Sequence, residues 1–130
     1  MSSPIPEEVN RVLTSAPFIA SLGIQLESVG RGECSTVLPL AHQHLQQDGF
    51  VHAGVQATMA DHTAGAAAAS LVAKGQLVLT VEFKINFLRS AKGPRLLCRS
   101  KVLKSGAQLT VVESEVLCGA PGKERLVSKA

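Results

Sequence analysis

The segment from residue 52 to about residue 72 constrains the fold of this 130-residue chain more than any other feature of the sequence. It is rich in alanine, has no run of β-branched residues and carries few polar atoms, which predicts an α-helix. Small residues occupy almost every side of this helix, and a helix that is apolar all round is a buried one. We therefore expect a domain built around a single central helix.

Alternation of apolar and polar residues predicts strands on both sides of this helix. The clearest alternation spans residues 77–88, with one face made of Leu77, Leu79, Val81, Phe83, Ile85 and Phe87. Shorter strands are predicted at 22–27, 33–38, 95–104, 108–118 and 125–130. Because short turns join most of them, neighbouring strands must pair antiparallel. The predicted architecture is an α+β fold, with an antiparallel sheet of five or six strands wrapped around one long helix.

The N-terminal region is predicted to add a short amphipathic helix over residues 4–15, which Pro17 ends. Residues 40–51 have no periodicity and are predicted to form a loop. The chain is expected to be one domain, with residues 1–18 as N-terminal helix and lead-in and residues 19–130 as the core. Aliphatic residues on both faces of the 77–88 strand predict a homodimer or a larger homo-oligomer.

Composition argues against several classes of function. The chain has four Phe but no Tyr or Trp, and its net charge is only +3, so we expect no nucleic-acid partner. No GxGxxG segment joins a strand to a helix, which excludes a dinucleotide-binding fold. The N-terminus lacks a signal-peptide pattern, and the longest apolar stretch, residues 64–73, is too short to span a bilayer. We therefore expect a cytoplasmic protein without a membrane partner.

The three cysteines, Cys34, Cys98 and Cys118, are odd in number and far apart, with no CxxC pair. This spacing predicts neither a disulfide framework nor a zinc site, so we expect reduced, buried thiols and no metal. Much of the basic charge lies after residue 88, and its simplest location is a solvated strand face.

Asp61 is the strongest candidate for chemistry. It lies near the middle of the central helix, where apolar surroundings disfavour the charged form of a carboxylate and can poise a general base. Its neighbours one helical turn away are Ala57, Thr58, Ala64 and Gly65, all of them small, so its side chain should border open space. The alternative is an exposed carboxylate or an ion pair with Lys or Arg.

The start of the central helix is the second candidate. His52, Ala53 and Gly54 follow a glycine-containing loop, so backbone N–H groups without helical partners and the positive end of the helix dipole lie there. Such donors can stabilise an oxyanion if they point at a reacting carbonyl. His52 could act as a base, although a hydrogen bond that holds the loop is the simpler role.

Two motifs taken together give the chain a specific resemblance. The segment QQDGFVHAGVQATMADHTAG at residues 46–65, followed by TVEFKINFLR at residues 80–89, resembles the PaaI-like hotdog-fold acyl-CoA thioesterases. The likeness covers roughly residues 20–130. It implies a hotdog fold, a dimer of dimers, and hydrolysis of an acyl-CoA in which coenzyme A is part of the substrate and no separate cofactor is used.

The resemblance also implies roles for individual residues. Asp61 stands where these enzymes keep the carboxylate that attacks the thioester or activates water. Ala53 matches a motif glycine whose N–H polarises the carbonyl, and His52 and Gly54 flank it. Gln46 and Thr80 match polar site residues, Thr80 across the dimer interface. The expected substrate-binding residues are Gly65 and, for the phosphates of coenzyme A, Arg89, Lys92 and Arg95.

The sequence departs from the family pattern at two positions. Ala53 replaces the first glycine, which would cost activity if the position needed a positive φ and little if it has ordinary helical geometry. Gln46 is one methylene longer than the usual Asn. The Ala53 departure keeps open a catalytically silent acyl-CoA-binding or sensing protein.

A hotdog enoyl-CoA hydratase is a further alternative. That chemistry usually needs an Asp and a His working together, whereas His62, beside Asp61, is expected to point to another side of the helix. For the thioesterase, an apolar pocket lined by Val, Leu, Phe and Met59 would accept an aryl or a medium-chain acyl group.

Overall fold

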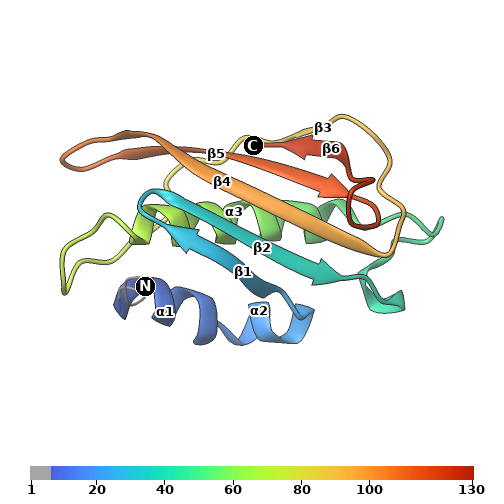
Figure 1. The fold of residues 1–130 in the computed structure, drawn as a ribbon, viewed down its shortest axis with the longest axis horizontal. Helices are drawn as coiled ribbons and strands as arrows, with labels where there is room; N and C mark the ends of the chain where they lie inside the picture. Colours follow the sequence, from blue (N-terminus) through green and yellow to red (C-terminus); the bar gives the residue numbers. More distant parts are fainter. Residues whose placement is uncertain (1–6) are drawn as a thin grey trace.

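The computed structural model describes residues 7–130, which form a six-stranded antiparallel sheet packed against one long helix (Figure 1). The helices are α1 (Glu7–Thr14), α2 (Pro17–Leu22) and α3 (Ala53–Ala69), with a short 3-10 helix, η1 (His42–His44). The strands are β1 (Gln25–Gly30), β2 (Glu33–Pro39), β3 (Asn86–Phe87), β4 (Arg95–Ser105), β5 (Thr110–Cys118) and β6 (Arg125–Lys129). Their order across the sheet is β1-β2-β4-β5-β6-β3, so the predicted architecture is confirmed.

Helix α3 lies against one face of the sheet, where it contacts β2, β4 and β5, and α1 packs against another side of it. Met59, Ala60 and Ala67 of this helix have no exposed surface. Small side chains let the strands approach the helix backbone closely, and Ser114 of β5 donates a 2.9 Å hydrogen bond to the carbonyl of Ala60. The prediction of a buried central helix is confirmed for the side of α3 that packs on the sheet, whereas the side that carries Asp61 is half-buried.

Alternating residues of the long strands β2, β4 and β5 form the buried inner face of the sheet. One rung of the sheet joins Thr36 on β2, Cys98 on β4 and Val116 on β5, and none of the three has exposed surface. Cys34, Cys98 and Cys118 are free and buried. Burial raises the pKa of the Cys34 thiol to about 12 and the pKa of the Cys98 thiol to about 11, so both stay protonated at neutral pH.

The N-terminal region differs from the prediction. Pro17 does not end a helix but begins α2. Proline is tolerated there because N–H groups in the first turn of a helix have no partner within the helix, so the missing N–H of proline breaks no hydrogen bond. Leu22, expected in the first strand, is the last residue of α2, and Gly23 ends that helix with a left-handed φ of 91°. The first strand therefore begins at Gln25. The expected helix start at residues 4–6 lies outside the described residues.

The clearest strand prediction, over residues 77–88, is wrong for most of its length. Only Asn86–Phe87 forms a strand, β3, which pairs with Ser128 and Lys129 of β6. The backbone of residues 77–85 makes no hydrogen bond to any other residue in 7–130. Alternation shows which side chains prefer an apolar environment, but a strand also needs a neighbouring backbone to pair with. Within one copy of the chain, β6 offers that neighbour only to the end of the segment.

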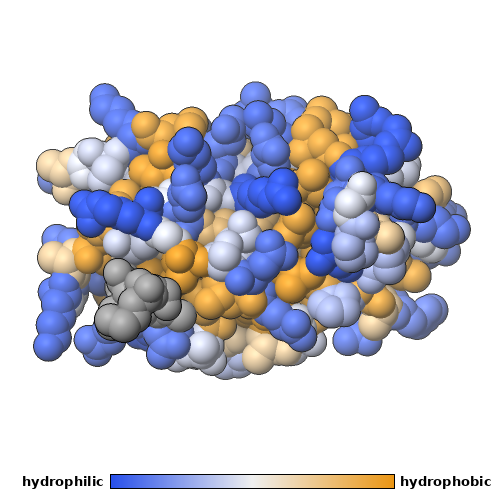
Figure 2. Space-filling model, viewed as in Figure 1, coloured by the Kyte–Doolittle hydropathy of each residue, from blue (hydrophilic) through white to orange (hydrophobic). Residues whose placement is uncertain are grey.

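The face of the sheet turned away from α3 carries charged residues of the long strands. Glu33, Lys101 and Glu113 lie opposite one another on β2, β4 and β5, and Lys129 of β6 lies 3.0 Å from Glu113. Figure 2 shows hydrophilic side chains spread across the molecule with hydrophobic surface between them. Alternating charges of this kind fit the solvated strand face that was expected for Lys101 and its neighbours. Among the described residues, no helix has the length and apolar character needed to cross a bilayer.

Candidate active site

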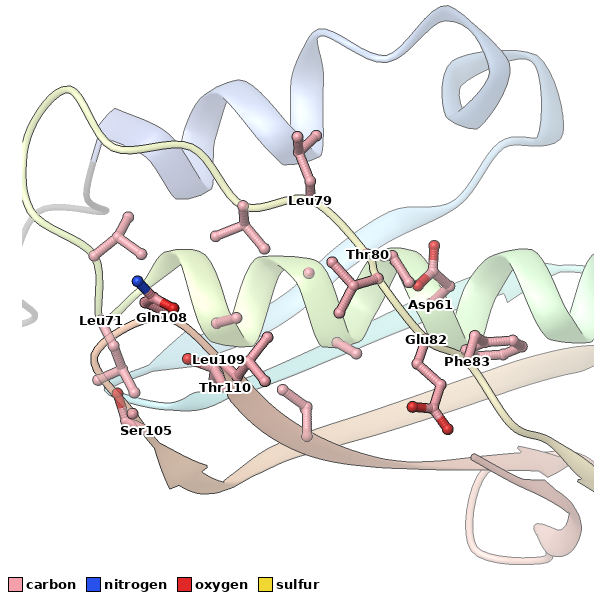
Figure 3. Close-up of a pocket in the computed structure, with 18 of the residues that line it drawn as sticks. Asp61, Leu71, Leu79, Thr80, Glu82, Phe83, Ser105, Gln108, Leu109 and Thr110 are labelled. Atoms are coloured by element: carbon pink, nitrogen blue, oxygen red, sulfur yellow. Dashed lines mark hydrogen bonds between the residues drawn. The ribbon is translucent and has the colours of Figure 1, made fainter.

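Asp61 lies on the less buried side of α3, beside the segment that crosses over the helix (Figure 3). The hydroxyl of Thr80 donates a 2.8 Å hydrogen bond to Oδ1 of Asp61 in the same copy of the chain, whereas the family resemblance implied that Thr80 would reach a site across the dimer interface. Within residues 7–130, no Lys, Arg or His forms a salt bridge with Asp61, which argues against the ion-pair alternative. The other carboxylate oxygen, Oδ2, has no hydrogen-bond partner among these residues. The carboxylate is thus held by one oxygen, and the other is available to substrate or water.

A cavity of about 510 Å³ opens beside Asp61. Gly65 and Ala68, which follow Asp61 on α3, form part of its floor. Its walls are residues 76–84 and the tip of the β4–β5 hairpin, residues 105–110 (Figure 3). A Cβ atom at Gly65 would meet no atom within 4 Å. Asp61 therefore borders open space, as its small helical neighbours predict.

His52 caps the N-terminus of α3. Its Nδ1 accepts a 2.8 Å hydrogen bond from the N–H of Gly54, so in the neutral ring the proton lies on Nε2. A Cβ atom on Gly54 would lie 3.0 Å from this Nδ1, which accounts for a glycine there. The bond caps the first turn of α3 and does not hold the preceding loop, which was the role expected for His52. It also occupies the Gly54 N–H, so Gly54 offers no free donor to a carbonyl in this arrangement.

Ala53 is the first residue of α3, and its N–H makes no hydrogen bond within residues 7–130. No non-glycine residue in that range has a positive φ, so the methyl group of Ala53 does not strain the backbone. An unpaired N–H at a helix N-terminus lies at the positive end of the helix dipole. It suits a carbonyl oxygen that gains negative charge during a reaction.

Gln46 lies in the turn before α3, which the Leu45–Val51 bridge closes. Its Oε1 accepts hydrogen bonds from the N–H groups of Asp48 and Phe50. The oxygen therefore shapes this loop, and the amide NH₂ is the part left to face a substrate. The sequence indicates that Gln46 is a polar site residue, but it does not indicate the hydrogen bonds that occupy its Oε1 atom.

The three basic residues expected to bind phosphate are not equivalent. The Arg95 guanidinium lies 2.7 Å from the Glu124 carboxylate, an ion pair that offsets its charge. Lys92 Nζ lies 5.9 Å from the ring centroid of Phe50, and Arg89 is exposed just after β3. Within residues 7–130 neither Arg89 nor Lys92 forms a salt bridge, so these two offer unpaired charge to an anion.

His62 does not join Asp61 in a catalytic pair. Its Nε2 is buried without a hydrogen-bond partner in residues 7–130. Burial lowers the pKa of His62, an effect that the charge of Asp61 partly offsets. Neighbouring helical residues point about 100° apart, and His62 does not line the cavity. The Asp–His pair on which a hydratase would rely is therefore not formed by these two residues.

Other cavity-lining residues differ from the expectation. Met59, expected in the pocket, has no exposed surface and belongs to the core. The hairpin tip, with Gln108 and Leu109, forms a wall instead. No local pattern indicates this contact, because the tip reaches the cavity only through the pairing of β4 with β5. Within residues 7–130, no three His, Cys, Asp or Glu side chains gather as metal ligands would.

The sequence of this chain matches a known protein family. Residues 48–124 match the model of the thioesterase superfamily. The 1,4-dihydroxy-2-naphthoyl-CoA hydrolase of Listeria monocytogenes is 25% identical over 96 residues, which cover 74% of this chain and 78% of that protein.

Solved structures agree with the family match. A thioesterase family protein from Silicibacter pomeroyi aligns with a TM-score of 0.90 at 36% identity and covers 95% of this chain and 90% of that one. A conserved protein from Pseudomonas aeruginosa aligns with a TM-score of 0.83 at 28% identity, over 95% and 94% of the two chains. The chain belongs to the thioesterase superfamily and has the hotdog fold that its motifs indicated.

Proposed function

We propose that this protein hydrolyses acyl-CoA thioesters to a free acid and coenzyme A. The observation that carries the proposal is the Asp61 carboxylate, held by Thr80 beside a cavity of about 510 Å³. In the reaction, the hydroxyl of water adds to the carbonyl carbon, the carbon–sulfur bond breaks, and the thiolate takes up a proton. Asp61 acts either as the base that removes a proton from water or as a nucleophile that water later displaces.

The N–H of Ala53 supplies the second part of this mechanism. It has no partner in residues 7–130 and lies at the positive end of the α3 dipole. A thioester oxygen bound there would be stabilised as negative charge develops on it in the transition state. His52 supports this site indirectly, because its bond to the Gly54 N–H fixes the first turn of the helix.

Asp61 and Ala53 of the same copy cannot serve one substrate. They are eight residues apart on one helix, which separates them by about 12 Å along its axis. Reacting atoms must approach within about 3–3.5 Å, and a thioester carbonyl is far too short to span the difference. We therefore propose that each site combines Asp61 and Thr80 of one copy with Ala53 of a second copy.

The volume and lining of the cavity support an aryl or medium-chain acyl group as the acyl part of the substrate. Its volume of about 510 Å³ falls within the usual range of small-molecule sites, about 300–1,000 Å³. Its lining includes the aliphatic residues Leu71, Val72, Leu77 and Leu109. The Listeria monocytogenes relative is named for an aromatic acyl group, which supports the aryl class. Arg89 and Lys92 are the residues we assign to the phosphates of coenzyme A, and Arg95 contributes less because of Glu124.

Three buried, unpaired thiols support a reducing compartment, and we place the protein in the cytoplasm. A dimer of dimers remains a prediction from the family resemblance, and sedimentation of the purified chain tests it.

The test is a panel of acyl-CoAs with free thiol release as the readout, run beside Asp61 variants. Asp61→Asn and Asp61→Ala should lower kcat by at least ~10², the scale expected for a positioned base. Asp48→Asn is the matched control, because Asp48 is an exposed loop carboxylate outside the cavity. Near-wild-type turnover in either Asp61 variant would contradict the assignment.

The panel also separates the alternatives. No thiol release from any acyl-CoA, together with tight binding of coenzyme A, would identify an acyl-CoA-binding or sensing protein. Hydration of an enoyl-CoA without thiol release would identify a hydratase. Preference for aryl or medium-chain substrates over acetyl-CoA would support the proposed substrate class.

A further inference from the structure

We propose that Phe50 is a positioning residue for substrate binding, whose ring holds the ammonium group of Lys92 where this group can meet the phosphates of coenzyme A. The inference rests on the proposed function, since it concerns the part of the same substrate that carries negative charge. Phe50 has no charge of its own to offer an anion, so it acts through Lys92.

The side chain of Lys92 lies over the aromatic ring. Its Nζ atom is 5.9 Å from the centroid of the Phe50 ring, and a cation within about 6 Å of a ring centroid is attracted by the electrons of the ring face. Both side chains reach the surface, since Lys92 is exposed and Phe50 is 37% exposed. Lys92 forms no salt bridge within residues 7–130, so in this part of the chain the ring is the group that attracts its ammonium.

The backbone segments that carry the two side chains are bonded to each other. The N–H of Val51 donates a 2.8 Å hydrogen bond to the carbonyl of Ala91, and both of these residues are buried. Val51 follows Phe50 in the sequence, and Ala91 precedes Lys92. The carbonyl of Phe50 also accepts a 2.8 Å hydrogen bond from the N–H of Gln46. The approach of Lys92 to the ring is therefore built into the pairing of two segments that are far apart in the sequence.

The chain is packed as closely on the other side of Lys92. A Cβ atom at Gly93 would lie 3.3 Å from Sγ of Cys118 and 3.4 Å from the Cα atom of Gly119. This contact leaves residues 91–93 little room to move away from the loop that carries Phe50. The base of the Lys92 side chain is thus fixed, and only its side-chain torsions remain for the ring to restrict.

Arg95 illustrates why a ring suits this task better than a carboxylate. The Arg95 guanidinium lies 2.7 Å from the Glu124 carboxylate, which positions the cation and also offsets its charge. An aromatic ring carries no net charge, so it restricts an ammonium group without neutralising it. A long side chain that is already restricted loses less conformational entropy when it binds an anion. Lys92 is therefore held in place while its charge stays unpaired.

Phe50 lies near the proposed reaction centre but outside the acyl cavity. It precedes Ala53, the proposed donor to the thioester oxygen, by three residues, which span at most about 10–11 Å. Neither Phe50 nor Lys92 lines the cavity beside Asp61. Removing the ring should therefore change the binding of the phosphates and leave the binding of the acyl group as it is.

The test compares two substrates with the same acyl group. One is the acyl-CoA, and the other is the acyl-pantetheine thioester, which lacks all the phosphates. At low ionic strength, Phe50→Leu should raise KM for the acyl-CoA by about two- to fivefold, the range for an exposed cation–π contact, with kcat unchanged. KM for the acyl-pantetheine should not change. Phe50→Tyr keeps an aromatic ring and should retain the wild-type KM for both substrates.

Further variants separate the effect of the ring on Lys92 from other effects. Phe18→Leu removes another exposed ring, over which no cation lies within residues 7–130, and it should change neither KM. Lys92→Met removes the charge, and the double variant of Phe50 and Lys92 should bind acyl-CoA no more weakly than Lys92→Met alone. Additive losses in the double variant would overturn the positioning role. An equal rise of KM for both substrates in Phe50→Leu would overturn it as well.

Binding of coenzyme A itself, measured by titration calorimetry, makes the result independent of hydrolysis. Phe50→Leu should weaken Kd by the same factor as it raises KM, and Phe50→Tyr should not. This pattern, without thiol release from any acyl-CoA, would support the role of Phe50 and refute the proposed function. Hydrolysis of acyl-CoA with a KM that Phe50→Leu leaves unchanged would do the reverse.

Discussion

Thr80 and Asp61, nineteen residues apart in the sequence, are joined by a 2.8 Å hydrogen bond from the threonine hydroxyl to Oδ1 of the carboxylate. The bond connects the central helix to a segment that has no backbone hydrogen bonds of its own within the described chain (Figure 3). It leaves Oδ2 of Asp61 as the oxygen that can meet water or a thioester. The geometry of the proposed site therefore depends on one hydroxyl group.

Replacing Thr80 tests that dependence. Thr80→Val keeps the shape of the side chain and removes the hydroxyl, and hydrogen bonds to charged groups contribute about 1.5–3 kcal/mol. Because Thr80 is exposed, we expect the lower end of this range, a fall in kcat of roughly tenfold. Thr80→Ser keeps the donor and should stay close to wild type. Equal losses in the two variants, measured by thiol release, would show that the hydroxyl does not orient the carboxylate.

The His52 cap predicts a stability difference between two substitutions. His52→Ala removes the acceptor for the Gly54 N–H and should lower the free energy of unfolding by about 1 kcal/mol. His52→Asn offers a side-chain oxygen to the same N–H and should retain most of that stability. Urea unfolding of both variants measures the difference. If the asparagine variant is as unstable as the alanine variant, the cap is not what stabilises the helix start.

The buried ring of His62 predicts an acid-sensitive step in stability. Burial lowers its pKa below the ordinary value of 6.5, so between the folded and unfolded pKa values the unfolded chain binds more protons. The contribution of the neutral His62 ring to the free energy of unfolding is therefore fully present above about pH 6.5. It is lost as the pH falls from there toward the lower pKa of the folded state. His62→Gln should flatten this fall in urea unfolding experiments.

Glu124 provides the control for the His62 experiment. Hydrogen bonds from its own backbone and from Arg95 lower the pKa of Glu124 below the ordinary value of 4.5. Its contribution is present above that value and is lost only on further acidification. Glu124→Gln should therefore leave the step that begins near pH 6.5 unchanged. A step of the same size in His62→Gln and in wild type would exclude His62 as its source.

Gly65 predicts a change in substrate range. A Cβ atom at this position meets nothing within 4 Å, and the residue lines the cavity, so Gly65→Leu should fill the cavity without disturbing the core. Turnover of aryl and medium-chain acyl-CoAs should fall by more than turnover of acetyl-CoA. The variant should be no less stable than wild type, because Gly in a helix interior costs about 0.8–1 kcal/mol.

The neighbouring Ala66→Leu is the matched control for that substitution. Ala66 has no exposed surface, so added methylenes should overpack the core and cost about 1–3 kcal/mol of stability. An equal loss of turnover on all acyl-CoAs in Gly65→Leu would place the acyl group outside this cavity.

Much of the fold follows from local patterns in the sequence. The small residues of 52–72 specify a helix that other backbone can approach, and alternation assigns Thr36, Cys98 and Val116 to the inner face of the sheet. The same reasoning singles out Asp61, because its neighbours one turn away are small. These inferences succeed because side-chain size and polarity at a fixed spacing are local properties.

Contacts between distant segments could not be obtained in this way. Thr80 reaches Asp61, and Arg95 reaches Glu124 across 29 positions, only because the sheet and helix bring them together. The alternation of residues 77–85 specifies two faces but cannot create the hydrogen-bonding neighbour that a strand requires, and one copy of the chain does not supply it. Local patterns indicate whether each side chain lies in an apolar or a polar environment. Which backbone or side chain then lies beside it depends on how elements far apart in the chain pack.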